Sequence, residues 1–236
     1  SGGPLLKYID RKKVKLIRLP VQSKNPILIF LNSIILTIII LFCGINIIHA
    51  RSRAPAWACL IASKITRRKF VTTFHGTYNF NNSIKKFYNS VMVKSDLIIA
   101  GSNFIFSHIN ENYSNYLNKN QKLLTIFRGI NLEYFDSTKI KNDAEAKLMN
   151  EWKIDKTLSF YNKKIILFPG RLTSWKGHEI FIESLNIFKQ KNPDKLFFAI
   201  ILGSDQGRKI YKKKIQRLIE QYRLIQDILF IDNCDK

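Results

Sequence analysis

Acidic residues are scarce in this chain of 236 residues. It has 17 Asp and Glu against 39 Lys and Arg, a formal net charge of +22 at pH 7. Such an excess favours anionic partners in general: nucleic acid, an acidic membrane surface or phosphorylated ligands. The clusters Arg67–Lys69 and Lys212–Lys214 lack the interleaved aromatic residues that bind single-stranded nucleic acid by base stacking. The sequence therefore gives no specific support for nucleic acid, and a compositional bias toward lysine explains the charge equally well.

Cysteine is also rare, with Cys43, Cys59 and Cys234 scattered along the chain. The spacing fits neither a metal site nor a disulfide framework. We therefore predict buried free thiols and a reducing, cytoplasmic environment. Carboxylates with metal-ligand spacing are missing too, so the sequence predicts no metal and no other cofactor.

Charge is absent from one long apolar segment, residues 27–48, whose length meets the roughly 20 residues that a membrane span needs. Asn25 and Pro26 suit the start of a helix, and Gly44 suits its end. We predict a buried helix over Pro26–Cys43. A single-span membrane protein remains the alternative, because periodicity does not separate a core helix from a span.

The rest of the chain alternates apolar strands with helical patterns, which predicts an α/β fold with parallel sheets. The predicted strands are Val14–Leu19, Ile45–His49, Phe70–Phe74, Leu97–Ala100, Leu123–Phe127, Ile165–Phe168, Phe197–Leu202 and Ile228–Ile231. The predicted helices are Pro26–Cys43, Pro55–Ile65, Ser83–Val93, Asn103–Tyr113, Ala144–Trp152, His178–Gln190 and Arg208–Tyr222. We expect domains at residues 1–135 and 163–236, joined by a polar linker with one helix at residues 136–162.

A basic turn follows the strand Ile165–Phe168, where ligands of parallel α/β sheets bind. Arg171 and Lys176 flank this turn, and a helix is predicted directly after Gly177. Free N–H groups at a helix start favour phosphate, and the two cations would strengthen its binding. Gly170 and Gly177 permit close backbone approach. An ordinary basic loop is the alternative reading.

The run Phe168–Leu172, followed by Trp175-Lys176-Gly177, resembles the donor-phosphate motif of the family-4 retaining glycosyltransferases. This resemblance implies a GT-B-like fold of two Rossmann-like domains with parallel sheets, the second domain being incomplete. It implies that Arg171 and Lys176 hold the donor diphosphate and act in catalysis, with Gly170 and Gly177 beside them.

Further segments are similar to the same family and occur in its order. They are His49–Pro55, Thr72–Tyr78, Ile99–Ser102 and Phe127–Asn131, with Phe135 after the last. The resemblance implies that His75 lies nearest the transferring sugar and is catalytic. It places His49, Arg51, Arg53, Gly76, Tyr78 and Ser102 along an acceptor-side cleft, and Gly203 and Asp205 near the donor. Without the resemblance, His75 is more typical of a satisfied histidine at a strand end than of a catalytic residue.

The family pattern also has parts that this sequence lacks. The first strand and a glycine-rich loop would precede residue 1, and a pair of glutamates would follow residue 236. Ser1–Gly3 would then end the second family strand. With no initiator Met and no evident signal peptide, we expect a chain truncated at both ends and inactive by itself.

The resemblance implies transfer of a sugar from a nucleotide-diphosphate-sugar to a saccharide or lipid-linked acceptor. The expected setting is envelope polysaccharide, lipopolysaccharide or glycolipid synthesis, at the inner face of the cytoplasmic membrane, with an anionic membrane surface as a further partner. The alternative is a charge-driven, non-catalytic membrane- or nucleic-acid-binding module. We further expect His108 and His178 at the surface, and Trp57, Tyr88 and Trp152 in the core.

Overall fold

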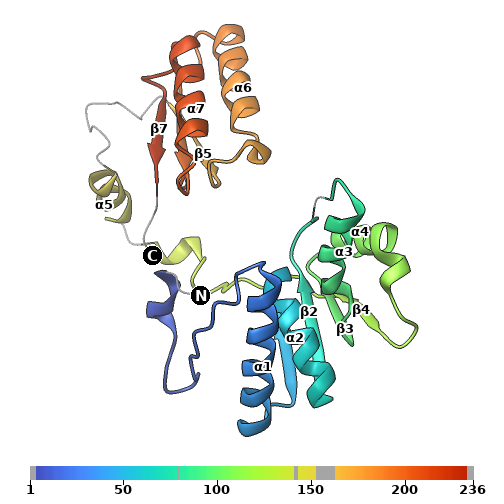
Figure 1. Ribbon diagram of the computed structural model, residues 1–236. Coiled ribbons are helices and arrows are strands. Elements are labelled where there is room, and N and C mark those ends of the chain that lie inside the picture. The colour runs from blue at the N-terminus through green and yellow to red at the C-terminus, as the bar shows by residue number, and fades with distance from the viewer. Residues whose placement is uncertain (1–3, 79, 141–142, 153–162, 233–236) are drawn as a thin grey trace. The chain divides into compact units, whose positions relative to one another are not determined.

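The computed structural model describes residues 4–78, 80–140, 143–152 and 163–232. Its contacts divide the chain into two compact units, Ser1–Leu132 and Glu133–Lys236, shown in Figure 1. Each unit is an α/β structure built on its own parallel sheet. The predicted α/β class with two parallel sheets is therefore confirmed.

The first unit contains a four-stranded parallel sheet in the order β1-β2-β3-β4. Its strands are β1 (Ile47–Ala50), β2 (Lys69–Phe74), β3 (Leu97–Ala100) and β4 (Lys122–Thr125). Its α-helices are α1 (Pro26–Phe42), α2 (Arg53–Thr66), α3 (Ser83–Ser90) and α4 (Asn103–Tyr113). Phe70, Phe74, Ile98 and Ile109 are almost wholly buried and belong to its core.

Helix α1 begins and ends as its sequence predicts. The Asn25 side chain accepts a hydrogen bond from the Ile27 N–H at 2.9 Å, and Pro26 occupies the first turn. After the helix, Gly44 adopts a φ of +62°, in the left-handed region that glycine tolerates best. The helix lies alongside α2 (Figure 1).

The expected burial of α1 is wrong for much of its surface. Ile40 is 3% exposed, whereas Ile27 is 69% and Phe42 is 87% exposed. The physical reason is that one helix face packs on α2 while the apolar residues continue around the helix. Among the described residues, no helix has the length and apolar character needed to cross a bilayer.

Three local predictions need correction or fall outside the description. Residues 14–19 form no strand, and Val14 and Ile17 are about half exposed. An isolated extended segment cannot be stable as a strand without a hydrogen-bonded neighbour. Cys43 is exposed at the end of α1 rather than buried, and Cys59 is only partly buried. Cys234 and Ser1–Gly3 lie outside the described residues.

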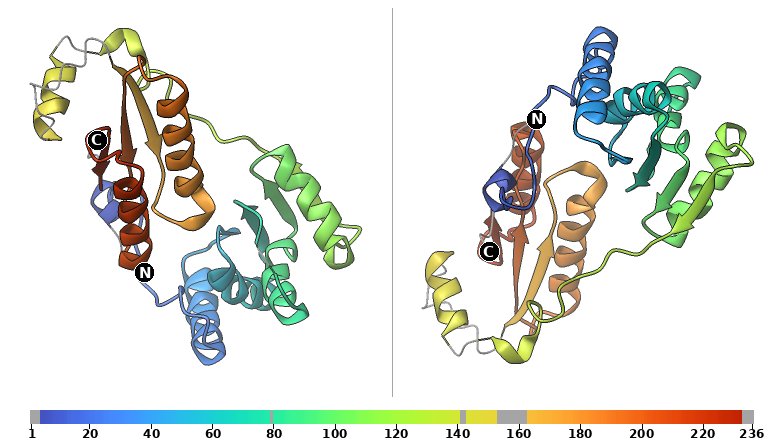
Figure 2. Two further views of the ribbon diagram at one scale, coloured as in Figure 1. Left: turned by 90° about the horizontal axis from the view of Figure 1, so that it is seen from above. Right: turned by 90° about the horizontal axis from the view of Figure 1, so that it is seen from below.

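The second unit contains a three-stranded parallel sheet in the order β5-β6-β7. The strands are β5 (Lys164–Pro169), β6 (Phe197–Leu202) and β7 (Ile228–Ile231), and the helices are α5 (Ala144–Glu151), α6 (His178–Lys191) and α7 (Lys209–Gln221). In both views of Figure 2 the strands lie beside α6 and α7. Ile182, Ile201, Ile215 and Leu224 are fully buried and belong to the core there.

Candidate functional site

The carboxyl ends of the first unit's strands meet at one edge of the sheet. Phe74 of β2 is in register with Ala100 of β3, which is in register with Thr125 of β4. Whatever follows these strands therefore collects at the same edge, where parallel α/β folds bind ligands. His75 follows β2 directly, and Arg128 comes three residues after the end of β4.

His75 is half-buried between two arginines that come from different loops. The Nε of Arg51 lies 3.2 Å from His75 Nε2, and Nη2 of Arg128 lies 2.6 Å from His75 Nδ1. A neutral imidazole has one acceptor nitrogen, while guanidinium groups only donate. Therefore only one of the two arginines can donate a hydrogen bond to the ring at a time. At the other ring nitrogen, the N–H of the imidazole faces an N–H of the guanidinium.

The ionisation of the histidines follows from this crowding of positive charge. Burial is the main cause that lowers the pKa of His75, and the charges of Arg128, Arg51 and His49 lower it further. Burial and then Arg51 lower the pKa of His49, whose Nε2 is 2.8 Å from Thr73 Oγ1. At neutral pH both rings are held in the uncharged form, ready to donate and accept hydrogen bonds.

Arg53 and Tyr78 are brought together in a separate contact. The Arg53 guanidinium lies 4.5 Å from the centre of the Tyr78 ring and donates to Asn89 Oδ1 at 2.7 Å. Asn89 is fully buried and its amide also donates to the Tyr78 carbonyl at 3.4 Å. These contacts place Arg53 in the packing of the first unit as well as near its carboxyl edge.

The two other acceptor-side candidates have simple surroundings. Ser102 is the N-cap of α4, and its Oγ accepts the Ile105 N–H at 3.3 Å. A Cβ placed on Gly76 would meet nothing within 4 Å, so open space lies beside this glycine. Ser102 therefore has a structural role that accounts for its position, and Gly76 leaves room next to His75.

In the second unit, two glycines bring the loops after β5 and β6 into contact. Gly203 has a φ of +151°, and a Cβ there would collide with the carbonyl of Gly170. The Gly170 N–H also donates to the Leu202 carbonyl at 2.8 Å. Only glycine fits at position 203, because any side chain would push the two loops apart.

The loop after β5 is anchored from inside and basic on its outside. Leu172 and Thr173 are each 1% exposed, and the Leu172 N–H donates to the Ser204 carbonyl at 3.1 Å. Arg171 and Lys176 are exposed on either side of these anchors. Two outward cations are thus held on a loop whose backbone is fixed.

Helix α6 begins directly after this loop. Gly177 precedes it with a φ of +80°, and no side chain caps the first turn. The unsatisfied N–H groups and the helix dipole make such a start favourable for an anion. Asp205, by contrast, accepts the Gly207 N–H at 2.8 Å and so stabilises its own turn.

His178 corrects a prediction, since it is fully buried rather than at the surface. Its ring contacts Phe168 edge-on, with centroids 5.0 Å apart, underneath the basic loop. Burial lowers its pKa, against a smaller opposite effect of the Thr173 and Gly170 backbone. Neither ring nitrogen makes a hydrogen bond of normal geometry to a described residue. His108 is half-buried, with its ring near Phe74 and Tyr113.

Arg128 is the main residue that the sequence analysis did not single out. It lies within Phe127–Asn131, a segment noted above only for its similarity to the family. Its place just beyond a strand end was the available signal, because that position puts it at the edge of the sheet. Nothing in the sequence around Thr73 indicates that its hydroxyl contacts His49. In the described part of the chain, no three acidic, His or Cys side chains are grouped as a metal site would require.

Two α/β units, each built on a parallel sheet with polar groups at the carboxyl ends of its strands, are the architecture found in GT-B glycosyltransferases. Residues 2–134 match the family Glycosyltransferase Family 4, and residues 150–236 match Glycosyl transferases group 1. The chain therefore belongs to Glycosyltransferase Family 4. The resemblance seen in the sequence is confirmed.

Similar proteins agree with this assignment. An uncharacterized glycosyltransferase of Methanocaldococcus jannaschii is 26% identical over 61% of this chain and 36% of that protein. Spore coat protein SA of Bacillus subtilis is 22% identical over 67% of this chain and 40% of that protein. The chain thus spans well under half the length of these relatives.

Solved structures match over nearly the whole chain. A glycosyltransferase from Rickettsia africae has a TM-score of 0.78 and 35% identity, covering 99% of this chain and 59% of that one. An Anabaena protein in complex with UDP-glucose has a TM-score of 0.76 and 18% identity, covering 100% of this chain and 60% of that one. The second likeness shows the fold alone.

Proposed function

We propose that this chain is part of an enzyme that transfers a sugar from a nucleotide-diphosphate-sugar to an acceptor. The observation that carries the proposal is the anchored basic loop of the second unit. Arg171 and Lys176 are exposed on it, and the uncapped start of α6 follows. This combination of two cations and free N–H groups suits a diphosphate better than a neutral ligand.

The proposed chemistry follows from charge. When the bond between sugar and diphosphate breaks, negative charge grows on the leaving diphosphate. Arg171, Lys176 and the α6 N–H groups would stabilise that charge, and one such donor contributes on the order of 3 kcal/mol to the transition state. Gly170 and Gly177 would let the backbone approach the phosphates closely, with Gly203 holding the neighbouring loop. Retention of configuration is part of the proposal.

We assign the sugar and acceptor contacts to the carboxyl edge of the first unit. His75 would hydrogen-bond the transferring sugar, and its lowered pKa keeps the ring neutral for that role. The arginine, Arg51 or Arg128, that is not hydrogen-bonded to His75 would donate to a hydroxyl or an anionic group of the acceptor substrate. His49, Gly76 and Tyr78 would line the same region, with Arg53 and Ser102 in supporting positions. Asp205 belongs to the second unit and would support the donor side there.

A uridine diphosphate sugar is the donor to test first, because the similar Anabaena structure holds UDP-glucose. For the acceptor we propose a saccharide or lipid-linked saccharide of envelope polysaccharide, lipopolysaccharide or glycolipid synthesis. The net charge of +22 supports peripheral attachment to the anionic inner face of the cytoplasmic membrane. The chain spans about 60% of the similar structures, so we propose that it does not turn over by itself.

The test measures binding of a panel of nucleoside diphosphates and nucleotide-sugars by calorimetry, on a full-length version of the protein. The comparison is an Arg171→Ala, Lys176→Ala double variant, which should fold because both side chains are exposed. Lys189 is unsuitable as a control because it pairs with Asp227, so Lys191→Ala, Lys195→Ala provides the matched loss of charge.

Saturable binding that only the Arg171, Lys176 variant loses would support the transferase and name the donor. Equal binding by the wild type and both variants would show that Arg171 and Lys176 do not bind the nucleotide. No nucleotide binding, together with retention on nucleic acid that falls steeply with salt, would favour the charge-driven module instead.

A further inference from the structure

A second concentration of positive charge in the first unit lies away from the carboxyl ends of its strands. A pocket of about 500 Å³ lies at the opposite, amino edge of the sheet, where β2, β3 and β4 begin. We call it the basic pocket. It is lined by Leu60, Ser63, Lys64, Arg67, Arg68, Lys69, Phe70, Lys94, Ser95, Asp96, Asn118, Asn120 and Gln121.

The charge of the basic pocket is not balanced from within. Five lining residues are cationic, and Asp96 is the single lining carboxylate. Asp96 is already engaged, since its Oδ2 accepts the Phe70 N–H at 2.8 Å. Within the described residues, none of the five cations forms an ion pair with a carboxylate. Cations that line one pocket without a paired carboxylate attract an anion.

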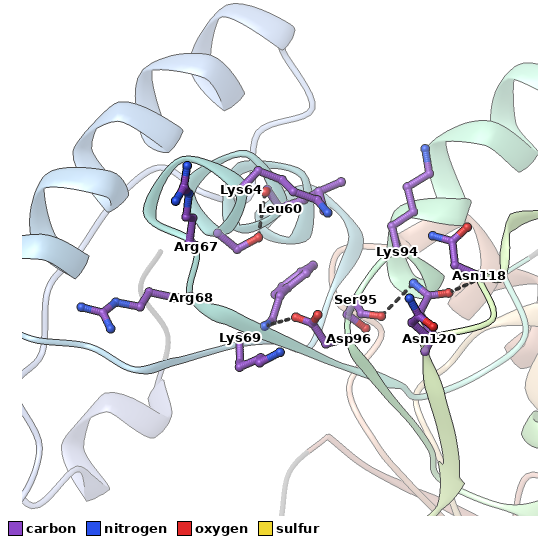
Figure 3. Close-up of a pocket in the computed structure, with 13 residues that line it drawn as sticks. Leu60, Lys64, Arg67, Arg68, Lys69, Lys94, Ser95, Asp96, Asn118 and Asn120 are labelled. Atoms are coloured by element: carbon purple, nitrogen blue, oxygen red, sulfur yellow. Dashed lines mark hydrogen bonds between the residues drawn. The ribbon is translucent and has the colours of Figure 1, made fainter.

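Two of the lining lysines point toward the opposite wall of the basic pocket (Figure 3). In Figure 3, Lys64 from α2 and Lys69 from β2 extend toward the side that carries Asn118 and Asn120. Lys94 is engaged elsewhere, with its ammonium 4.7 Å from the centre of the Phe87 ring. Lys64 and Lys69 are therefore the cations available to a bound group, and the exposed Arg67 also lines the pocket.

The opposite wall is polar and held in place. Gln121 donates to the carbonyls of Val93 and Ser95 at 3.0 and 2.8 Å, and its Oε1 accepts the Asn118 N–H at 2.8 Å. The side-chain amides of Asn118 and Asn120 have no hydrogen bond to any residue that the structure describes. The amides on this wall and the ammonium groups opposite them supply hydrogen-bond donors that an oxyanion accepts.

Arg67 adds an observation of a different kind. It follows α2 with a φ of +53°, in the left-handed region where glycine is the usual residue. The chain thus keeps a bulky cation where the backbone prefers glycine. Next to it, Nε of Arg68 is buried without a partner among the described residues, and its Nη1 donates to Asn46 at 3.3 Å.

A purely structural reading would assign these cations to the negative end of the α2 dipole. Lys69 does not fit that reading, because it belongs to β2, and neither do the free amides of Asn118 and Asn120 on the far wall. We propose that the basic pocket binds a phosphate group, carried by either an anionic lipid headgroup or a soluble phosphorylated molecule. The proposal does not rest on the proposed transferase activity, whose donor motif lies in the other unit.

The test uses the ¹⁵N-labelled chain and inorganic pyrophosphate, followed by residue-resolved NMR. We expect saturable shifts of the amide signals of residues 67–70 and 118–121. The exposed Lys64→Gln, Lys69→Gln variant should weaken this binding about tenfold, since two surface ion pairs are lost. The control Lys209→Gln, Lys213→Gln removes the same charge from the exposed surface of α7 and should leave these shifts unchanged.

Arg67→Gly separates function from structure. It relieves the left-handed backbone at that position, so we expect unchanged or higher thermal stability together with weaker pyrophosphate binding. Unchanged binding in both Arg67→Gly and the double lysine variant would overturn the proposal. So would shifts confined to residues 170–177, because pyrophosphate would then bind only the donor motif.

Flotation with vesicles distinguishes the two sources of phosphate. Retention on phosphatidylglycerol but not phosphatidylcholine vesicles, lost in the Lys64→Gln, Lys69→Gln variant, would identify a lipid headgroup. If the Lys64→Gln, Lys69→Gln variant loses pyrophosphate binding but is retained on vesicles as well as the wild type is, the ligand of the pocket is a soluble phosphorylated molecule. If the variant changes neither, the proposal is wrong.

Discussion

Nη2 of Arg128 lies 2.6 Å from Nδ1 of His75, although the two residues are 53 positions apart in the sequence. Arg51 approaches the other ring nitrogen, so both sides of the imidazole face a cation. This arrangement disfavours protonation of the ring and leaves one guanidinium donor without an acceptor. His75 is therefore a neutral group in a strongly positive setting, which is where a polar or anionic ligand would be stabilised.

Replacing Arg128 by Gln should raise the pKa of His75, because one of the positive charges that lower it is removed. Burial, the largest cause, remains, so the pKa should still lie below the ordinary histidine value. Titration of the His75 ring signals by NMR measures this directly. The control is Lys122→Gln, because Lys122 begins β4 and so lies at the end of the sheet opposite His75. Equal pKa values in wild type and Arg128→Gln would contradict the contact.

Acid should destabilise the second unit through His178. Burial lowers its pKa, so the folded state holds the ring neutral while the unfolded chain protonates it near its ordinary value. The free energy of unfolding therefore suffers no loss from His178 above about pH 6.5. It falls as the pH drops from there toward the lowered pKa of His178 in the folded state. We expect the free energy of unfolding to decline less steeply between about pH 6.5 and 5 in His178→Phe. Identical slopes from denaturant titrations would refute this role.

Gly203→Ala should be among the most damaging single substitutions in the second unit. It would place a Cβ against the Gly170 carbonyl and force a φ of +151° on an alanine. Overpacking and backbone strain together should cost about 3 kcal/mol. Gly207→Ala is a matched control, with a φ of +80° but no atom near its Cβ, and should cost only about 1 kcal/mol. Thermal unfolding of the two variants measures the difference.

The exposed apolar surface of α1 predicts unequal effects of truncation along one helix. Ile40→Ala should cost about 2–4 kcal/mol, because its side chain is 3% exposed and lies in the core. Phe42→Ala removes a larger side chain but one that is 87% exposed, so the change should stay within about 0.5 kcal/mol. If both variants unfold equally easily in urea, α1 is covered on its outer surface as well.

Much of the fold follows from local sequence pattern. The strands at Leu97–Ala100, Phe197–Leu202 and Ile228–Ile231 have the bounds predicted from their apolar runs. The start and end of α1 follow from Asn25, Pro26 and Gly44. These features depend on neighbouring residues only, through hydrogen bonds within a turn and through backbone preference, so a single sequence is enough to determine them.

The sequence by itself also placed Arg171 and Lys176 on a turn between a strand and a helix, because strand, glycine and helix start are all local signals. Only the tertiary structure decided that Arg128 meets His75, that His178 is buried and that most of the apolar α1 is exposed. Those outcomes depend on strand register and on which helix faces which neighbour. Both are set by packing between segments far apart in the chain, and no pattern within one segment records them.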